Sequence, residues 1–278
     1  MDHYALIGHP VKHSKSPLIH AAFARQTQQE LSYQALLAPL DGFSDTVEIF
    51  RAGGGRGANI TVPFKIEACS LASRLTGRAR LAGSVNTLTF IDGDIVGDNT
   101  DGVGLVRDLL VNLGYQLTGR NILLLGAGGA ARGVLFPLLQ TRPISLTIAN
   151  RTVKHAHELR AAFAPYAGQT AFTAGGFDDI VGWDFDVIIN ATSASLDKEP
   201  LPLPADIFAP DALVYDMMYG SGDTPFLSWA RMAGVTRLSD GLGMLVEQAA
   251  ESFALWRGVR PRSASVLSRL RHKLAPKD

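Results

Sequence analysis

The chain has 278 residues, and its 26 Lys and Arg residues balance its 26 Asp and Glu residues. Hydrophobic residues make up 46% and charged residues 19% of the chain, which excludes an intrinsically disordered protein and suits about two globular domains. Because there is no basic excess, general binding to nucleic acid or to anionic membranes lacks its usual electrostatic driving force.

The cysteine content and the first residues point to a reducing compartment. The single cysteine, Cys69, excludes an internal disulfide and a multi-cysteine metal site, and we predict no metal. Residues 1–4 lack the basic and apolar segments of a signal peptide. The most apolar stretch, 122–139, is interrupted by Arg132 and four glycines, which argues against a membrane span. We therefore expect a cytoplasmic protein.

Short apolar strands alternate with helical stretches over the first hundred residues. The predicted strands are residues 4–8, 32–37 and 58–61, with a further strand pair, 85–90 and 95–98, joined by an Asp-Gly turn. Helices are predicted to begin at Ser16 and Asp41, each acting as the cap, and at Pro63. The glycine-rich run 53–57 precedes a strand rather than a helix, which favours a flexible turn over a phosphate loop. The alternation predicts a mostly parallel sheet covered by helices.

A second α/β pattern follows a helix that begins near Gly102 and ends at Gly114, a residue type common at helix C-caps. Its predicted strands are near-continuous runs of Ile, Leu and Val, namely 122–125, 145–149, 186–190 and 213–217. Such runs are expected of parallel strands buried on both faces. Two further helices are predicted at 244–256 and 263–273.

A glycine fingerprint lies between the first of these strands and a helical run. Gly126, Gly128 and Ala131 form the pattern G-x-G-x-x-A. The first glycine permits a tight turn, the second lets the backbone approach a pyrophosphate, and the alanine allows close helix–strand packing. The helix N-terminus then offers N–H groups and partial positive charge to the phosphates. Because the strand–turn–helix context is present, we predict a dinucleotide site here rather than a purely structural turn.

The residues after the next strand select the cofactor. An NAD-type fold usually places Asp or Glu about 20 residues after the fingerprint, where it binds the ribose 2′-hydroxyl. Here the chain has Asn150, Arg151 and Thr152. Arg151 can pair with a 2′-phosphate, and Lys154 and His155 add nearby donors. The sequence therefore favours NADP, and the alternative is that Arg151 is a solvated residue at a helix start.

Candidate substrate-side residues lie in the first half of the chain. Ser14 and Ser16 would point the same way in an extended segment and could both donate to a carboxylate, although Ser16 serves equally well as a helix cap. Thr61 ends a predicted strand. Lys65 has apolar neighbours that favour loss of its charge, as acid–base catalysis requires, or it is a solvated head on a buried stem. Asp101 is a further candidate, although its segment is first interpreted as a helix cap. Asn86 could hydrogen-bond a hydroxylated ligand or simply close a turn.

Taken together, these segments resemble the shikimate dehydrogenase family. The matching stretches follow the order and spacing of that family and cover almost the whole chain: 8–17, 59–65, 82–87, 97–102, 126–130, 150–152, 216–219, 224–227 and 240–248. The resemblance implies an α/β fold with an N-terminal substrate domain, a Rossmann-type NADP domain and a cleft between them. The implied substrate domain is 1–101 completed by helices in 241–278, and the implied NADP domain is 102–240.

The resemblance also implies an activity and its residues. The activity is reversible, NADP-dependent reduction of 3-dehydroshikimate to shikimate, on the route to chorismate and the aromatic amino acids, by a monomer or homodimer. Lys65 would transfer the proton, and Asp101 would hold Lys65 and a substrate hydroxyl in place. The implied substrate contacts are Ser14, Ser16, Thr61, Asn86, Tyr219 and Gln248. The implied NADP contacts are Gly126, Ala127, Gly128, Gly129, Ala130, Asn150, Arg151, Thr152, Lys154, His155, Met217 and Gly241.

Two departures and two rival functions accompany this resemblance. Many relatives carry an arginine where His155 stands, and here Lys154 can supply that charge. Some relatives have an acidic residue at Gly77. The nearer rival is a quinate/shikimate dehydrogenase that uses NAD, against which Arg151 counts. The other is a non-catalytic NADP-sensing regulator, which would need no proton donor such as Lys65.

Overall fold

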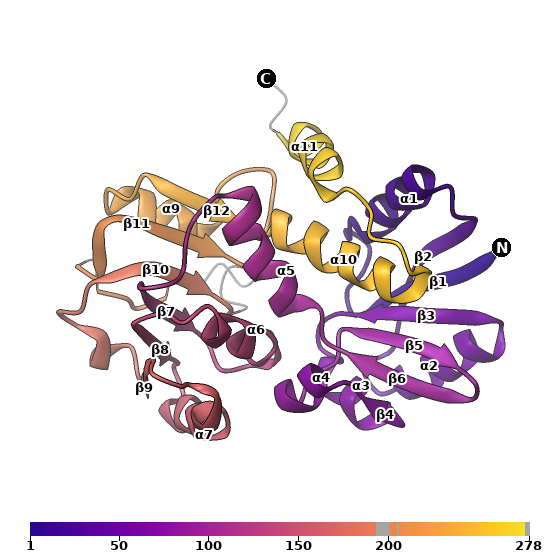
Figure 1. The fold of residues 1–278 in the computed structure, drawn as a ribbon, viewed down its shortest axis with the longest axis horizontal. Helices are drawn as coiled ribbons and strands as arrows, with labels where there is room; N and C mark the ends of the chain where they lie inside the picture. Colours follow the sequence, from indigo (N-terminus) through magenta and orange to yellow (C-terminus); the bar gives the residue numbers. More distant parts are fainter. Residues whose placement is uncertain (193–200, 205, 276–278) are drawn as a thin grey trace. The chain divides into compact units, whose positions relative to one another are not determined.

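The computed structural model describes residues 1–192, 201–204 and 206–275, and the chain divides into two compact units (Figure 1). The first unit comprises Met1–Gly104 and Leu245–Ser268, and the second comprises Leu105–Met244 and Arg269–Asp278. Three helices begin in one unit and end in the other: α5 (Asp101–Arg107), α10 (Leu242–Arg257) and α11 (Ser263–Leu274). The assignment of 1–101 with 241–278 to the substrate and of 102–240 to NADP stays a prediction.

The first unit is built on a six-stranded sheet in the order β2-β1-β3-β5-β6-β4. Its strands are β1 (Asp2–Gly8), β2 (Leu31–Leu37), β3 (Gly55–Ile60), β4 (Arg74–Leu75), β5 (Thr87–Ile91) and β6 (Asp94–Asp98). Strand β1 pairs in parallel with β2 and β3, and β4 pairs in parallel with β6. Strand β5 is antiparallel to β3 and β6, and a tight turn at Asp92–Gly93 joins β5 to β6. The predicted mostly parallel sheet is confirmed.

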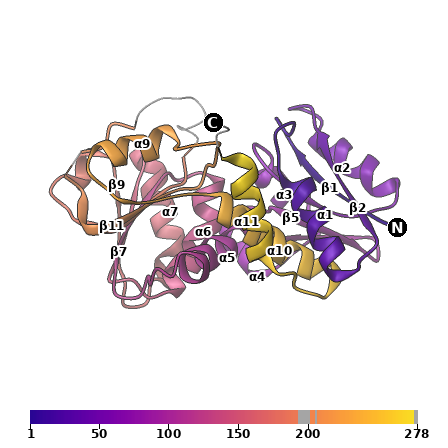
Figure 2. The ribbon, with the colours of Figure 1, turned by 90° about the horizontal axis from the view of Figure 1, so that it is seen from above.

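Helices cover both faces of this sheet. The helices α2 (Phe43–Ala52), α3 (Lys65–Leu71) and α4 (Gly77–Ala82) pack on one face, where Phe43, Phe64 and Ala79 join Ile7 and Leu88 in a buried cluster. The other face carries α1 (Ser16–Thr27) and α10, which lie on the same side of the sheet in Figures 1 and 2. Neighbouring strand residues point to opposite faces, so one strand supplies both cores.

The core under α1 and α10 is an aromatic cluster with a histidine at its centre. The His20 ring stacks on Tyr33 with centroids 4.0 Å apart and planes 4° from parallel, and it lies 5.5 Å from the Trp256 ring. His20 is 1% exposed, and neither of its ring nitrogens has a hydrogen-bond partner of good geometry in the described part of the chain. Burial lowers the pKa of His20 to about 3, although the neighbouring Asn59 amide opposes the shift. His20 is therefore neutral in the folded protein.

The second unit has a fully parallel sheet in the order β12-β11-β10-β7-β8-β9. Its strands are β7 (Asn121–Leu125), β8 (Ser145–Ala149), β9 (Ala171–Gly175), β10 (Phe185–Asn190), β11 (Phe208–Asp216) and β12 (Arg237–Asp240). Counted within the unit, this is the 3-2-1-4-5-6 order of dinucleotide-binding folds, with the switch point between β7 and β10. Among the described residues, no helix is both long and apolar enough to cross a membrane.

Several local predictions differ from the structure. Ser16 is the first residue of α1, so Lys15 and not Ser16 occupies the cap position, and the Ser16 hydroxyl accepts a hydrogen bond from Ser14. Gly42, not Asp41, precedes α2 as its cap. The predicted flexible turn at 53–57 is partly strand, and a Cβ at Gly57 would lie 2.6 Å from Trp256 Nε1, so close packing requires this glycine. Three strands with few branched apolar residues are not predicted from the sequence: β4, β9 and β12.

Buried neutral His20 predicts that acid destabilises the first unit. The unfolded chain binds a proton on His20 below about its ordinary pKa of 6.5, whereas the folded chain rejects that proton until about pH 3. The stability contributed by neutral His20 is thus present above pH 6.5 and is lost as the pH falls. Between pH 7 and pH 5 the expected loss is about 2 kcal/mol of unfolding free energy, measured by urea denaturation.

The His20→Phe variant should lose this share of the acid sensitivity. Phenylalanine preserves an aromatic ring against Tyr33 and carries no titratable group. The exposed His157, changed to Phe in a matched control, should leave the wild-type dependence on pH in place. Identical pH dependence in the wild type and His20→Phe would contradict a buried histidine that stays neutral.

Candidate active site

A lysine and an aspartate from separate parts of the first unit form an ion pair. Lys65 begins α3, which follows β3, and Asp101 begins α5, which follows β6. Lys65 Nζ donates to Asp101 Oδ2 at 2.6 Å, and the two side chains are 19% and 6% exposed. The ammonium group is therefore held in one place at the edge of solvent. A cation fixed in this way can give a proton to an oxygen bound beside it.

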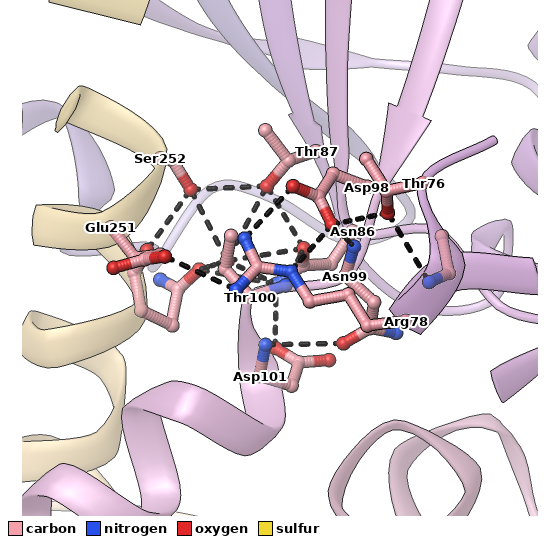
Figure 3. A network of polar contacts seen from close by, with 12 residues as sticks. Thr76, Arg78, Asn86, Thr87, Asp98, Asn99, Thr100, Asp101, Glu251 and Ser252 are labelled. Carbon is pink, nitrogen blue, oxygen red and sulfur yellow. Dashed lines mark hydrogen bonds and ion pairs between the residues drawn. The ribbon is translucent and has the colours of Figure 1, made fainter. Parts of the chain in front are cut away.

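The other oxygen of the Asp101 carboxylate is held by Asn86 (Figure 3). Asn86 Nδ2 donates to Asp101 Oδ1 at 2.7 Å, and the backbone N–H of Thr100 donates to Asn86 Oδ1 at 2.8 Å. Because a backbone N–H can act only as a donor, it settles which end of the amide is oxygen. The Asp101 backbone N–H donates to Asn99 Oδ1 at 3.1 Å, which fixes the start of α5. Both carboxylate oxygens of Asp101 thus have a donor in a defined position.

Helix α10 brings Gln248 to the same place from far along the chain. Asn86 Nδ2 lies 3.3 Å from Gln248 Oε1, and Gln248 Nε2 donates to the Leu245 carbonyl at 2.8 Å. The Gln248 side chain is therefore oriented by its own helix and meets Asn86 across 162 positions of sequence. Four residues predicted from the sequence meet here, and they are Lys65, Asn86, Asp101 and Gln248.

A cluster of ion pairs ties α10 to the sheet. The Arg78 guanidinium donates to both oxygens of Asp98, at 2.6 and 2.8 Å, and to Glu251 of α10 at 3.1 Å. Burial opposes the charge of Arg78, but the hydrogen bonds and charges of Asp98 and then Glu251 outweigh it and raise the pKa of Arg78 above its usual value. Arg260 donates to Glu251 at 2.5 Å and to the buried Glu247 at 3.1 Å. Such partly buried, fork-shaped pairs hold a helix more firmly than exposed ones do.

The serine pair forms a second polar group in the first unit. Ser14 Oγ donates to Ser16 Oγ at 3.2 Å, and the Ser16 side chain is also a hydrogen-bonding neighbour of Tyr33. Burial raises the pKa of Tyr33 well above its usual value, so the phenol stays neutral and donates to Asn59 Oδ1 at 2.9 Å. Thr61 packs against Gly8, where a Cβ would clash with its methyl group. Hydroxyls arranged in this way can donate to a carboxylate.

The second unit places the glycine fingerprint at the carboxyl end of β7. Gly126 has φ +106°, a conformation that L side chains rarely adopt, and a Cβ there would lie 3.2 Å from the Ala191 carbonyl beside β10. The helix α6 (Gly129–Gln140) begins with Gly128 as its cap. Within the described part of the chain, nothing beyond the neighbours of Gly128 in sequence and in its helix lies within 4 Å of where its Cβ would be. A helix N-terminus with room beside this glycine suits a pyrophosphate.

Three basic side chains follow the neighbouring strand β8. Arg151, Lys154 and His155 are all exposed at the start of α7 (Val153–Phe163). Lys154 lies 3.8 Å from Glu158 and is 82% exposed, so this pair holds it only weakly. Asn150 Nδ2 donates to the Thr152 carbonyl at 2.9 Å, which shapes the connection between β8 and α7. Residues 150–155 thus offer cations to a ligand phosphate, and none of these six residues carries a carboxylate.

The ends of β11 and β12 bring the remaining predicted residues together. The Met218 N–H donates to Asp216 Oδ1 at 3.0 Å, and the Gly241 N–H donates to the Met218 carbonyl at 2.9 Å. A Cβ at Gly241 would clash with the Met217 carbonyl, so the close approach of these two segments requires glycine. Tyr219 follows in this loop and belongs to the second unit, whereas the other predicted substrate contacts lie in the first.

The polar residues behind the Lys65–Asp101 pair are not predicted from the sequence. Asn59, Thr87, Thr100 and Ser252 are buried and hydrogen-bond to one another or to Asn86. Asn59 lies near the end of β3, Thr87 begins β5 and Thr100 follows β6, and such positions at strand ends could have pointed to these three residues. No local pattern distinguishes Ser252, which lies on an amphipathic helix among apolar residues.

Comparisons with known proteins cover nearly the whole chain. Family models match residues 6–88 (shikimate dehydrogenase substrate binding domain), 109–197 (shikimate/quinate 5-dehydrogenase) and 241–271 (shikimate 5′-dehydrogenase C-terminal domain). A protein of Aromatoleum aromaticum named shikimate dehydrogenase (NADP(+)) is 62% identical over 99% of this chain and 98% of its own.

Solved structures have the same fold. An Ael1 enzyme from Pseudomonas putida matches with a TM-score of 0.91 and 49% identity, over 100% of this chain and 99% of that one. A shikimate 5-dehydrogenase from Thermus thermophilus, solved in complex with NADP(H) and shikimate, matches with a TM-score of 0.86 and 31% identity, over 99% of this chain and 100% of that one.

Proposed function

The chain belongs to the shikimate dehydrogenase family and is an NADP-dependent oxidoreductase, and we propose that it interconverts 3-dehydroshikimate and shikimate by proton transfer through Lys65. The ion pair of Lys65 and Asp101, 2.6 Å between Nζ and Oδ2, is the observation that carries this proposal. We further propose that the first unit binds the substrate and the second binds NADP.

Lys65 and Asp101 divide the proton chemistry between them. Bound NADPH supplies the hydride for reduction of the ring ketone. The Lys65 ammonium stabilises the negative charge that grows on the ketone oxygen and gives that oxygen a proton; in oxidation Lys65 takes the proton back. Asp101 keeps Nζ directed at the reacting oxygen, and its carboxylate has lone pairs left to accept from a substrate hydroxyl.

The proposed substrate contacts sort by chemistry. The hydroxyls of Ser16 and Thr61 donate to the substrate carboxylate, and the Ser14 hydroxyl, which donates to Ser16 Oγ in this structure, turns to the carboxylate when the substrate binds. Asn86 and Gln248 bind ring hydroxyls through amides already oriented by the protein. Tyr219 of the second unit is a proposed additional substrate contact. A ring with a carboxylate at one end and hydroxyls at the other would thereby be held in one orientation.

The proposed NADP contacts follow the carboxyl ends of the parallel strands. The loop from Gly126 to Ala130 binds the pyrophosphate through its backbone, and Arg151 binds the 2′-phosphate with help from Lys154 or His155. The other proposed contacts are Asn150, Thr152, Met217 and Gly241.

Side-by-side assays with shikimate and quinate, each with NADP and NAD, test this proposal against the rival quinate/shikimate dehydrogenase. A preference for NAD or for quinate would favour that rival.

Substitution of Lys65 tests its proposed role as the proton donor. We expect Lys65→Ala to lower turnover by about 1,000-fold, because the reaction loses its proton donor, while binding of NADP changes little. Turnover is measured as NADPH formation by absorbance with shikimate and NADP, and binding by fluorescence titration. The exposed Lys12, changed to Ala, is the matched control and should keep the wild-type rate. Near-normal rates in Lys65→Ala would remove Lys65 from the mechanism, whereas a wild-type protein without turnover would favour the sensing role.

Substitution of Arg151 tests the selection of NADP over NAD. Arg151→Ala should raise the KM for NADP by about 30-fold, the value of a hydrogen-bonded ion pair of about 2 kcal/mol, and leave the KM for NAD nearly unchanged. Steady-state assays with the two cofactors measure both constants. The control is His157→Ala on α7, the helix that follows Arg151, and it should alter neither constant. An equal loss for NADP and NAD would contradict a contact between Arg151 and the 2′-phosphate.

A further inference from the structure

Two buried hydroxyl side chains lie behind the Lys65–Asp101 pair. Thr87 is the first residue of β5 and directly follows Asn86, and Ser252 lies on α10, one turn after Gln248. Both are fully buried, and their hydroxyl oxygens are 3.0 Å apart. Figure 3 shows them side by side next to Asn86.

The Thr87 hydroxyl acts on the amide of Asn86. Thr87 Oγ1 donates to Asn86 Oδ1 at 2.8 Å, beside the Thr100 N–H at the same distance. The Thr100 hydroxyl is a third donor to this oxygen, at 3.1 Å. Together the three donors restrain rotation of the amide about its terminal torsion, which is otherwise broad. Because the amide nitrogen lies opposite this oxygen, the restraint directs Nδ2 at Asp101 Oδ1, 2.7 Å away. Thr87 therefore controls Asp101 without touching it.

The Ser252 hydroxyl acts on α10. Ser252 Oγ donates to the Gln248 carbonyl at 3.0 Å and accepts from Asn59 Nδ2 at 2.9 Å. Asn59 belongs to β3, and its Nδ2 also lies 3.2 Å from the Asn86 carbonyl. The hydroxyl of Ser252 thus joins the turn of α10 that carries Gln248 to the strand segment that carries Asn86.

Packing alone does not call for hydroxyls at these two positions. A buried hydroxyl costs about 1–3 kcal/mol when it lacks a partner and brings little net stability when it has one. Valine has nearly the shape of threonine, and alanine suits a helix better than serine. What the hydroxyls add is direction, since each donates to an atom of a site residue, Thr87 to Asn86 and Ser252 to Gln248.

We propose that Thr87 and Ser252 are positioning residues of the dehydrogenase site, Thr87 orienting Asn86 and through it Asp101, and Ser252 setting the position of Gln248. The inference rests on the proposed function, because it assigns these residues to that reaction. Since Asp101 holds the proton donor, loss of the Thr87 hydroxyl slows the chemical step. Since Gln248 binds the substrate, loss of the Ser252 hydroxyl weakens substrate binding.

The test separates the two effects by steady-state kinetics on the full-length protein. Thr87→Val should lower kcat about 30-fold and raise the KM for shikimate by a smaller factor, because a misdirected Asn86 amide misplaces Asp101 and also weakens one substrate contact. Thr87→Ser retains the hydroxyl and should restore kcat to within about 3-fold of the wild type. Ser252→Ala should raise the KM for shikimate about 10-fold, the value of one hydrogen bond, and leave the KM for NADP unchanged.

Matched controls distinguish positioning from a merely structural role. Thr27 donates its hydroxyl to the Phe23 carbonyl within α1, so Thr27→Val removes a hydroxyl from the same unit without touching the network and should leave both constants unchanged. Rates are expressed per folded protein, measured by circular dichroism. If Thr87→Val lowers only the melting temperature, or if Thr87→Ser is as slow as Thr87→Val, the hydroxyl has no positioning role.

The outcomes also separate this inference from the proposed function. A wild-type protein that forms no NADPH from shikimate overturns the function and the inference together. A wild type that turns over normally beside a fully active Thr87→Val and Ser252→Ala overturns the inference alone. If Thr87→Val does not fold, the KM shift of Ser252→Ala decides the matter.

Discussion

The amide of Asn86 is the contact on which the site in the first unit depends. Its oxygen receives the Thr100 N–H and the Thr87 hydroxyl, and its nitrogen holds Asp101, which in turn holds Lys65. The backbone N–H of Thr100 can only donate, so the Asn86 atom that faces it must be the amide oxygen. The amide nitrogen must then donate to Asp101, and the donor and acceptor of each hydrogen bond up to the Lys65 ammonium group are therefore fixed.

Burial makes any other arrangement of these hydrogen bonds costly in free energy. Asn86, Asp101 and Thr87 are nearly or fully buried, so a misdirected donor would leave a polar atom unpaired at a cost of about 1–3 kcal/mol. The Arg78 cluster serves the same end from another side, because it fastens α10 to β6 and so keeps Gln248 near Asn86. In the first unit, the hydrogen bonds that satisfy the buried polar groups are thus the same ones that orient the site residues.

The second unit works by backbone geometry and by the charge at one strand end. Its parallel strands place their carboxyl ends along one edge, and the switch point between β7 and β10 lies where Gly126 approaches Ala191. Residues 150–155, which follow the next strand, include Arg151 and no carboxylate, which suits a ligand with an additional phosphate. One unit therefore orients groups through buried side chains, and the other through glycines and exposed cations.

The sequence by itself determined what local patterns encode. Strand runs, helix periods and the glycine fingerprint predicted two α/β units, and motif order indicated the family, with Lys65 and Asp101 among its residues. Tertiary structure alone decided that the Lys65 and Asp101 side chains meet, that Gln248 reaches Asn86, and that Thr87 and Ser252 lie behind them. It also overruled the Ser16 cap and the flexible turn at 53–57. The physical reason is separation along the sequence. Secondary-structure propensity depends on residues a few positions apart, whereas folding buries and pairs the side chains of Asn86 and Gln248, which are 162 positions apart.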